Sequence, residues 1–133
     1  MTLQNYLYRI LNVEETPEGT LYSISLIREC PIYKAHFPEM PVTPGACIVQ
    51  MVEELAADHL QTGLQMTGVK EAKFLVPLEP SDSICLIRLT FLQQEQENLK
   101  VQALVSDRAD RLYARISIIC KTKDIETWTP SNC

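Results

Sequence analysis

One segment of this chain has the hydrophobic period of a helix, and it lies between segments that have the pattern of strands. Apolar residues recur at three- and four-residue spacing over positions 47–60, with acidic residues between them. Thr43 is the predicted N-cap, Pro44 suits the first helical position, and Gly63 suits the stop. The pattern predicts one helix over about residues 44–61. Because apolar residues cover much of its circumference, we expect other elements to surround it.

Strand patterns stand on both sides of this helix. The turn signal Thr16-Pro17-Glu18-Gly19 joins the first two strands into a predicted hairpin. The stretch from Arg28 to Thr43 contains three prolines, so it cannot be continuous helix or sheet. The six predicted strands span residues 6–13, 21–27, 69–76, 83–92, 99–106 and 111–121. One helix among six strands indicates an α+β fold, with an antiparallel sheet wrapped around the helix.

Size and charge limit what such a fold can do. A length of 133 residues suits a single domain, so we treat 1–133 as one unit with a motif-free tail after residue 123. Seventeen acidic residues against twelve basic ones give a net charge of −5, which argues against nucleic acid and anionic membranes as partners. The longest uncharged stretch, residues 40–52, is too short to span a bilayer.

The cysteines and the N-terminal residues suggest the compartment. The five cysteines form no CxxC pair, so they indicate neither a zinc site nor a disulfide framework. Buried thiols in a reducing compartment are the simplest interpretation. The first ten residues lack a basic region followed by an apolar one, so we predict no signal peptide. We expect a cytoplasmic protein that needs no metal or other cofactor.

The segment from His36 to Gly45, HFPEMPVTPG, carries the most chemical information. It places a histidine on an irregular loop shortly before a predicted helix start. The first amides of a helix have no partner inside the helix and carry partial positive charge, so they can polarise a carbonyl oxygen. Gly45 leaves its amide accessible because it has no side chain. A base and an oxyanion donor can thus converge on a thioester or another carbonyl.

This segment resembles a motif of the hotdog-fold 3-hydroxyacyl-acyl-carrier-protein dehydratases, the FabZ/FabA type. A second stretch, VKEAKFLVPLEPSD at residues 69–82, resembles the strand that follows the helix in that family. The resemblance covers roughly residues 20–121. It implies a hotdog fold, a homodimer or an oligomer of dimers, and a thioester substrate on acyl carrier protein or coenzyme A. Fatty-acid synthesis is the pathway most typical of the family.

The resemblance also implies roles for individual residues. His36 matches the histidine that removes the α-proton of the substrate, and Gly45 matches the glycine whose amide polarises the thioester carbonyl. Their motif neighbours Phe37, Pro44 and Ala46 are expected to contact the substrate. In the family the site lies between two subunits, with the histidine of one subunit facing the acid position of the other.

Two helix positions depart from the family pattern. The family has a Glu or Asp fourteen residues after the histidine, where this chain has Gln50, and typically a Gln four residues later, where this chain has Glu54. A Gln amide can orient a hydroxyl group but cannot supply an acidic proton. Residues at i and i+4 lie about 6 Å apart on a helix, so Glu54 is a candidate replacement acid. Its neighbour Glu53 is the alternative residue to face the site.

Three functions therefore stay open. The first is dehydration of a 3-hydroxyacyl thioester, with Gln50 orienting the hydroxyl and Glu54 or a water supplying the proton. The second is hydrolysis of an acyl thioester. The third is binding of an acyl thioester without turnover, as the less active partner of a second hotdog subunit.

Other polar residues receive simpler interpretations. His59, near the predicted helix end, is expected to be structural, and Cys47 is expected to be a small buried residue. A basic patch for the acidic carrier or for coenzyme A phosphates is an alternative to scattered solvated side chains. The arginines concerned are Arg88, Arg108, Arg111 and Arg115.

Overall fold

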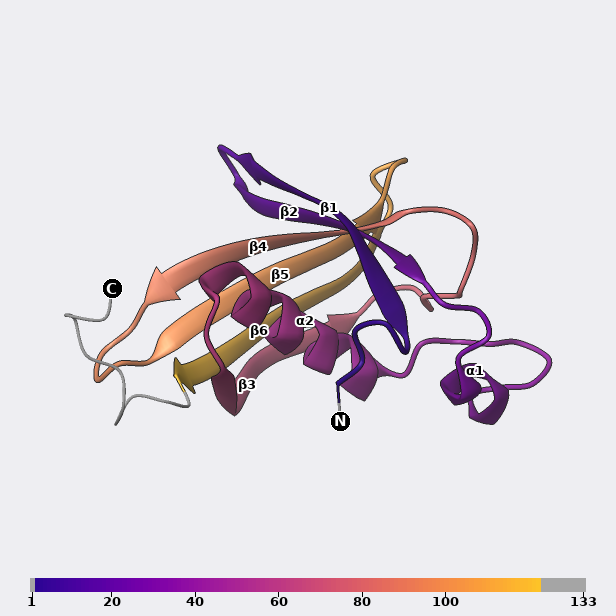
Figure 1. The fold of residues 1–133 in the computed structure, drawn as a ribbon, viewed down its shortest axis with the longest axis horizontal. Helices are drawn as coiled ribbons and strands as arrows, with labels where there is room; N and C mark the ends of the chain where they lie inside the picture. Colours follow the sequence, from indigo (N-terminus) through magenta and orange to yellow (C-terminus); the bar gives the residue numbers. More distant parts are fainter. Residues whose placement is uncertain (1, 123–133) are drawn as a thin grey trace.

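The computed structural model describes residues 2–122 of the chain; the tail after residue 123 lies outside the described residues. One six-stranded antiparallel sheet wraps around a long helix, as predicted (Figure 1). The strand order is β1-β2-β4-β5-β6-β3. The elements are β1 (Tyr8–Thr16), β2 (Gly19–Leu26), α1 (Pro31–Ala35), α2 (Gly45–Leu60), β3 (Leu64–Phe74), β4 (Cys85–Gln93), β5 (Leu99–Asp107) and β6 (Leu112–Thr122).

The central helix α2 lies in the concave side of the sheet (Figure 1). Its apolar side chains fill the space between helix and strands, since burial of apolar surface is the main force that holds the two layers together. Every second residue of the central strands points to the same core, as the alternation in β4 and β5 shows. The buried helix residues are Ile48, Met51, Val52, Leu55 and Ala56.

Both predicted helix caps are wrong. The residue in the N-cap position is Pro44, and no side chain caps the helix there. The Thr43 hydroxyl hydrogen-bonds instead to the Tyr33 hydroxyl at 2.8 Å, so it is not available to the first helical amides. At the other end, Gln61 adopts the left-handed conformation, with φ 55°, that Gly63 was expected to supply.

Strand β3 begins at Leu64, five residues before the predicted start. Its pairing with β6 shifts register between Met66 and Gly68 and again between Val69 and Glu71. A bulge interrupts the alternation of side chains, so a search for period two misses the first part of the strand. The short helix α1 was not predicted, although Pro31 at its first turn suits a helix start.

The two edges of the sheet are β1 and β3. Among the described residues, no strand pairs with the outer edge of β3. Apolar side chains are half-exposed along this edge, with Val69 at 49%, Phe74 at 47% and Leu75 at 45%. An exposed strand edge with apolar side chains is a natural place for a second chain to pair.

Candidate functional site

The His36-to-Gly45 segment forms one wall of a cavity of about 410 Å³. The first turn of α2 and the stretch that follows β3 form the rest. The cavity is mostly apolar, as expected for a site that holds an acyl chain. Its lining residues are His36, Phe37, Val42, Thr43, Pro44, Gly45, Ile48, Phe74, Leu75, Val76, Pro77 and Leu78.

Backbone hydrogen bonds fix the loop that carries His36. The Val42 N–H donates to the His36 carbonyl oxygen at 2.7 Å, which closes the loop on itself. The Thr43 N–H donates to the Leu78 carbonyl oxygen at 2.8 Å, which ties the loop to the opposite wall. The histidine therefore sits on a loop whose two ends are anchored, as a positioned base requires.

Sequence reasoning missed Tyr33, which stabilises the same loop from the interior of the protein. Its ring is buried, and its hydroxyl pairs with that of Thr43. Burial raises the pKa of Tyr33 to about 12, so the phenol stays neutral. Its hydrogen bond to Thr43 stabilises the loop. The only sequence signal is an aromatic residue three positions before His36, inside a turn that Pro31 begins.

His36 and Phe37 are exposed at the cavity mouth. Their rings meet edge to face, with centroids 5.8 Å apart and an interplanar angle of 60°. Phe37 is 59% exposed, so it offers apolar surface to whatever enters. The predicted contact residue Pro44 also lines the cavity, whereas Ala46 does not.

Gly45 is the first residue of α2 and brings the positive end of the helix to the cavity. Among the hydrogen bonds of residues 2–122, none has the Gly45 N–H as its donor. Gly45 is therefore placed to donate to a bound oxygen atom, beside His36. The ring of Phe74 packs against the α-carbon of this glycine, a contact between residues far apart in the sequence.

The two departures from the family pattern, Gln50 and Glu54, do not line this cavity. Glu54 accepts hydrogen bonds from the N–H groups of Leu3 at 2.7 Å and Gln4 at 2.9 Å and from the Tyr8 hydroxyl at 2.9 Å. The Gln50 side-chain amide donates to the same carboxylate at 2.9 Å. Glu54 thus anchors the start of the chain to α2. Glu53 is also engaged, since its carboxylate accepts from the Met66 N–H.

The other candidate groups, Cys47 and His59, do not line the cavity. Burial raises the pKa of the Cys47 thiol, which keeps it protonated and a poor nucleophile. His59 stacks on Phe91 with ring centroids 5.0 Å apart and lies 3.6 Å from a Glu15 carboxylate oxygen, which fits a structural role. No group of three metal-ligating side chains occurs in the described part of the chain.

The four arginines do not form one patch. Arg88 and Arg115 lie on the outer face of the sheet, in one row across β4, β5 and β6 with Leu104 between them. Arg108 lies in the turn after β5, and Arg111 stands over the ring of Tyr113. None of the four lines the cavity beside His36.

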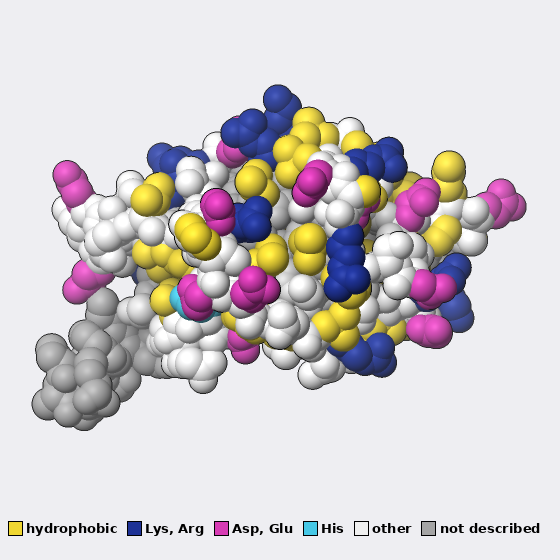
Figure 2. All heavy atoms as spheres, turned by 90° about the horizontal axis from the view of Figure 1, so that it is seen from above, with side chains coloured by type: hydrophobic (Ala, Val, Ile, Leu, Met, Phe, Trp, Pro, Cys, Tyr) yellow, Lys and Arg dark blue, Asp and Glu magenta, His cyan; other side chains and the backbone are white. Residues whose placement is uncertain are grey.

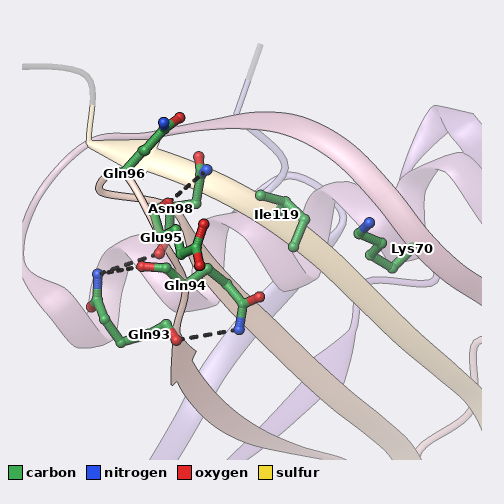
Figure 3. A pocket seen from close by; sticks show the side chains of 7 residues that line it. All are labelled: Lys70, Gln93, Gln94, Glu95, Gln96, Asn98 and Ile119. Carbon is green, nitrogen blue, oxygen red and sulfur yellow. Dashed lines mark hydrogen bonds between the residues drawn. The ribbon is translucent and has the colours of Figure 1, made fainter.

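A larger hollow, of about 720 Å³, lies beside the hairpin that joins β4 and β5 (Figure 3). Its walls are mainly amide side chains, and these donate to carbonyl oxygens of the same hairpin, as Gln93 does to Gln94 and Asn98. The amide groups therefore stabilise the turn. No histidine or cysteine lines this hollow, so the cavity beside His36 is the better candidate site.

Comparison with known proteins identifies a family and a shared fold. The model of the ApeI-like family, described as ApeI dehydratase, matches residues 12–114. The 3-hydroxyacyl-acyl-carrier-protein dehydratase FabZ of Burkholderia lata is 27% identical, over 94% of this chain and 90% of the relative.

Two solved structures are similar in fold alone. The dehydratase heterocomplex ApeI:P from Xenorhabdus doucetiae matches with a TM-score of 0.66 and 19% identity, over 85% of this chain and 97% of the other. A hypothetical thioesterase with coenzyme A from Streptococcus pneumoniae matches with a TM-score of 0.61 and 8% identity, over 87% and 88%.

Proposed function

The chain belongs to the ApeI-like dehydratase family, and from that premise we propose that it removes water from a 3-hydroxyacyl thioester. One observation carries the proposal: His36 and the amide of Gly45 line the same apolar cavity. A base and an oxyanion donor in one cavity are what abstraction of a proton next to a carbonyl requires. The hotdog fold, which the similar structures share, provides the frame.

In the proposed reaction, His36 takes a proton from C2 of the acyl chain. The electron pair of that C–H bond forms the C2–C3 double bond, and the C3–O bond breaks. Charge that develops on the thioester oxygen is stabilised by the Gly45 N–H at the positive end of α2. The departing hydroxide needs a proton to leave as water, and the proton that His36 has gained can reach it directly or through a water molecule.

Gln50 takes the place of a catalytic acid in this proposal. Its side chain would orient the substrate hydroxyl by hydrogen bonding, from the partner subunit of a homodimer. Glu54 holds the Gln50 amide group at 2.9 Å and thereby helps to position it. Because Glu54 already has four donors, we assign it this supporting role in preference to that of the acid.

The proposed homodimer forms through β3. Within residues 2–122 no strand pairs with its outer edge, Val69 and Phe74 are half-exposed on this strand, and Phe74 also lines the cavity. Pairing of two copies along this edge would satisfy the backbone groups and bury the apolar surface. It would also bring two cavities to one interface, and pairs of dimers are a further possible assembly.

Acyl carrier protein and coenzyme A are the proposed carriers of the substrate. The face in Figure 2 has acidic and basic side chains interspersed, with no single basic field on this side. A carrier that docks on this face would therefore be recognised by local contacts. No helix in the described part of the chain is long and apolar enough to cross a membrane, and we propose a cytoplasmic location.

A second candidate is binding without turnover, as one subunit of a heterodimer. It is favoured by Gln50 at the acid position and by the engagement of Glu54 with the N-terminal segment. A similar structure is named as a dehydratase heterocomplex. In such an assembly the other subunit would contribute the acid that faces His36.

Product analysis separates these functions. The full chain is incubated with 3-hydroxyacyl thioesters of several lengths on coenzyme A and on acyl carrier protein, and enoyl product and free thiol are both measured. Enoyl product supports dehydration, whereas free thiol without enoyl product contradicts it and indicates hydrolysis. Binding without either product indicates the binding subunit. In that case Gln50→Glu should create enoyl-forming activity.

A further inference from the structure

Phe74, the last residue of β3, lies directly over the start of α2. A methyl group on Gly45 would lie 2.8 Å from the Cε2 and Cζ atoms of this ring and 3.3 Å from Cε1. The two shorter separations lie below a normal carbon–carbon contact, so the ring would have to shift to admit the methyl group. Gly45 is not in the left-handed region. The ring, and not the backbone conformation, therefore limits the space at position 45, and a side chain there would have to displace the ring.

The backbone around Phe74 is held firmly. Phe74 itself pairs with Ala114 in β6, and the next N–H, of Leu75, donates to the Tyr113 carbonyl oxygen at 2.8 Å. The opposite wall is held by the hydrogen bonds of Val42 and Thr43. The width of the cavity between the ring and the loop is thus set by two anchored segments.

An acyl group that uses Gly45 must pass beside this ring. A carbonyl oxygen that accepts from the Gly45 N–H lies about 2.9 Å from the nitrogen, and its carbon lies about 1.2 Å further on. The carbonyl carbon carries C2 on one side and the sulfur on the other, and the proposal places C2 on the side of Phe74. Any group attached to C2 has to share that space with Phe74.

We propose that Phe74 is a specificity-determining residue that excludes thioesters branched at C2 and admits unbranched acyl chains. This inference rests on the proposed function, since it assumes that the thioester carbonyl binds at Gly45. A ring packed on the helix start leaves room for a flat or straight chain. A methyl branch at C2 would have to displace the ring or tilt the carbonyl away from the amide.

The test uses ligands that cannot react. In ketone analogues of acyl-coenzyme A, a methylene group replaces the thioester sulfur and the carbonyl oxygen is kept. Binding of a straight-chain analogue and of its 2-methyl counterpart is measured by calorimetry on the full chain. We expect the wild type to bind the straight-chain analogue at least about tenfold more tightly, the usual range for one misplaced methyl group.

Three variants locate the source of this preference. Phe74→Leu should reduce the ratio of the two affinities to about threefold or less, because it removes the flat ring and shortens the wall. Phe74→Tyr keeps the ring and should keep the ratio. Leu75→Ala changes a neighbour that lines the same cavity, whereas the atoms nearest position 45 all belong to Phe74, and it should also keep the ratio. Circular dichroism checks that each variant is folded.

A double mutant tests the contact itself. Gly45→Ala should weaken binding of the straight-chain analogue by at least about tenfold, because the new methyl group pushes the ring into the space that the ligand uses. Adding Phe74→Leu should recover most of that loss, since the two changes share one space. Additive losses in the double mutant would overturn the inference.

The outcomes distinguish the two proposals. If the wild type binds the straight-chain analogue but shows the same affinity for the branched one, or if Phe74→Leu leaves the ratio unchanged, the role of Phe74 is wrong and the proposed function stands. If the wild type binds neither analogue, the thioester site itself is wrong and both proposals fall.

Discussion

Glu54 is the residue whose surroundings most limit the chemistry of this site. Two backbone N–H groups, a tyrosine hydroxyl and a glutamine amide all point at its carboxylate. These four hydrogen bonds engage both oxygen atoms of the carboxylate. The sequence makes Glu54 a candidate acid because it lies one helical turn after the family's acid position, whereas the contacts indicate an anchor for the N-terminal segment.

Replacement of Glu54 by glutamine should therefore lower the stability of the fold. The amide that replaces the carboxylate keeps one acceptor and adds donors that face other donors, at a cost of roughly 1–3 kcal/mol in the free energy of unfolding. Urea denaturation measures it, with Glu14→Gln on the exposed face of β1 as a control that should change stability by less than about 0.5 kcal/mol. Unchanged stability together with abolished enoyl formation would contradict this account and restore Glu54 as an acid.

The sequence predicts which residues share a cavity when those residues lie close together in the chain. His36, Phe37 and Gly45 belong to one motif, and all three line the cavity. Phe74 and Tyr33 were missed because their roles arise from packing between distant segments, which no local pattern encodes. The competition for the Thr43 hydroxyl has the same origin, since a tertiary contact to Tyr33 replaced the local cap.

At the scale of elements, two tyrosines connect the first hairpin to α2. Tyr8 in β1 donates to Glu54, and Tyr22 in β2 donates to Asp58 one helical turn later, at 2.6 Å. Both rings are buried. Burial, followed by the neighbouring carboxylates, raises the pKa of each phenol above its ordinary value of 10.0. The hairpin edge is thus attached to the helix by two hydrogen bonds that need neutral phenols.

This attachment predicts a loss of stability in alkali. The pKa values are raised in the folded state, so their contribution to stability is complete below pH 10 and falls as the pH rises beyond it. The free energy of unfolding, measured by urea denaturation between pH 8 and pH 11.5, should decrease with a steeper slope for the wild type than for Tyr8→Phe or Tyr22→Phe. Equal slopes in all three proteins would show that these phenols do not titrate differently on folding.

The sequence predicts the type and order of the helices and strands better than it predicts the residues at which they begin and end. The six strands and α2 occur in the predicted order because period-two and helical patterns are both set by burial in one core. The start of β3 was missed because bulges at Met66 and Val69 break the alternation. The left-handed conformation of Gln61 was missed because glycine is preferred at a helix end but other residues can also adopt this conformation.

For the whole molecule, the decisive feature is the outer edge of β3, with which no strand in the described part of the chain pairs. The sequence predicts a shared site only through the family resemblance, because nothing in a single chain encodes its own partner. The folded chain adds that the exposed apolar side chains Val69, Phe74 and Leu75 follow one strand edge next to the cavity. Dimerisation at this edge would shield the cavity wall from water.

A charge on this edge should separate the proposed dimer. Val69→Glu places a carboxylate at a half-exposed edge position, where burial between two subunits would be costly. Light scattering coupled to size-exclusion chromatography should give the mass of a dimer for the wild type and of a monomer for this variant. Leu104→Glu is the matched control, because Leu104 is 42% exposed but lies on the outer face of β5. A monomeric wild type would contradict the proposed assembly.

The most direct test of the central claim is the rate of enoyl formation by His36→Asn against that of the wild type, on the same 3-hydroxyacyl thioester. Asparagine retains hydrogen bonding but cannot accept the C2 proton. We expect enoyl product with the wild type and a rate at least about 100-fold lower with the variant, the usual contribution of a general base. Equal rates in the two proteins, or no enoyl product from the wild type with any substrate, would contradict the claim that His36 is the base of a dehydratase.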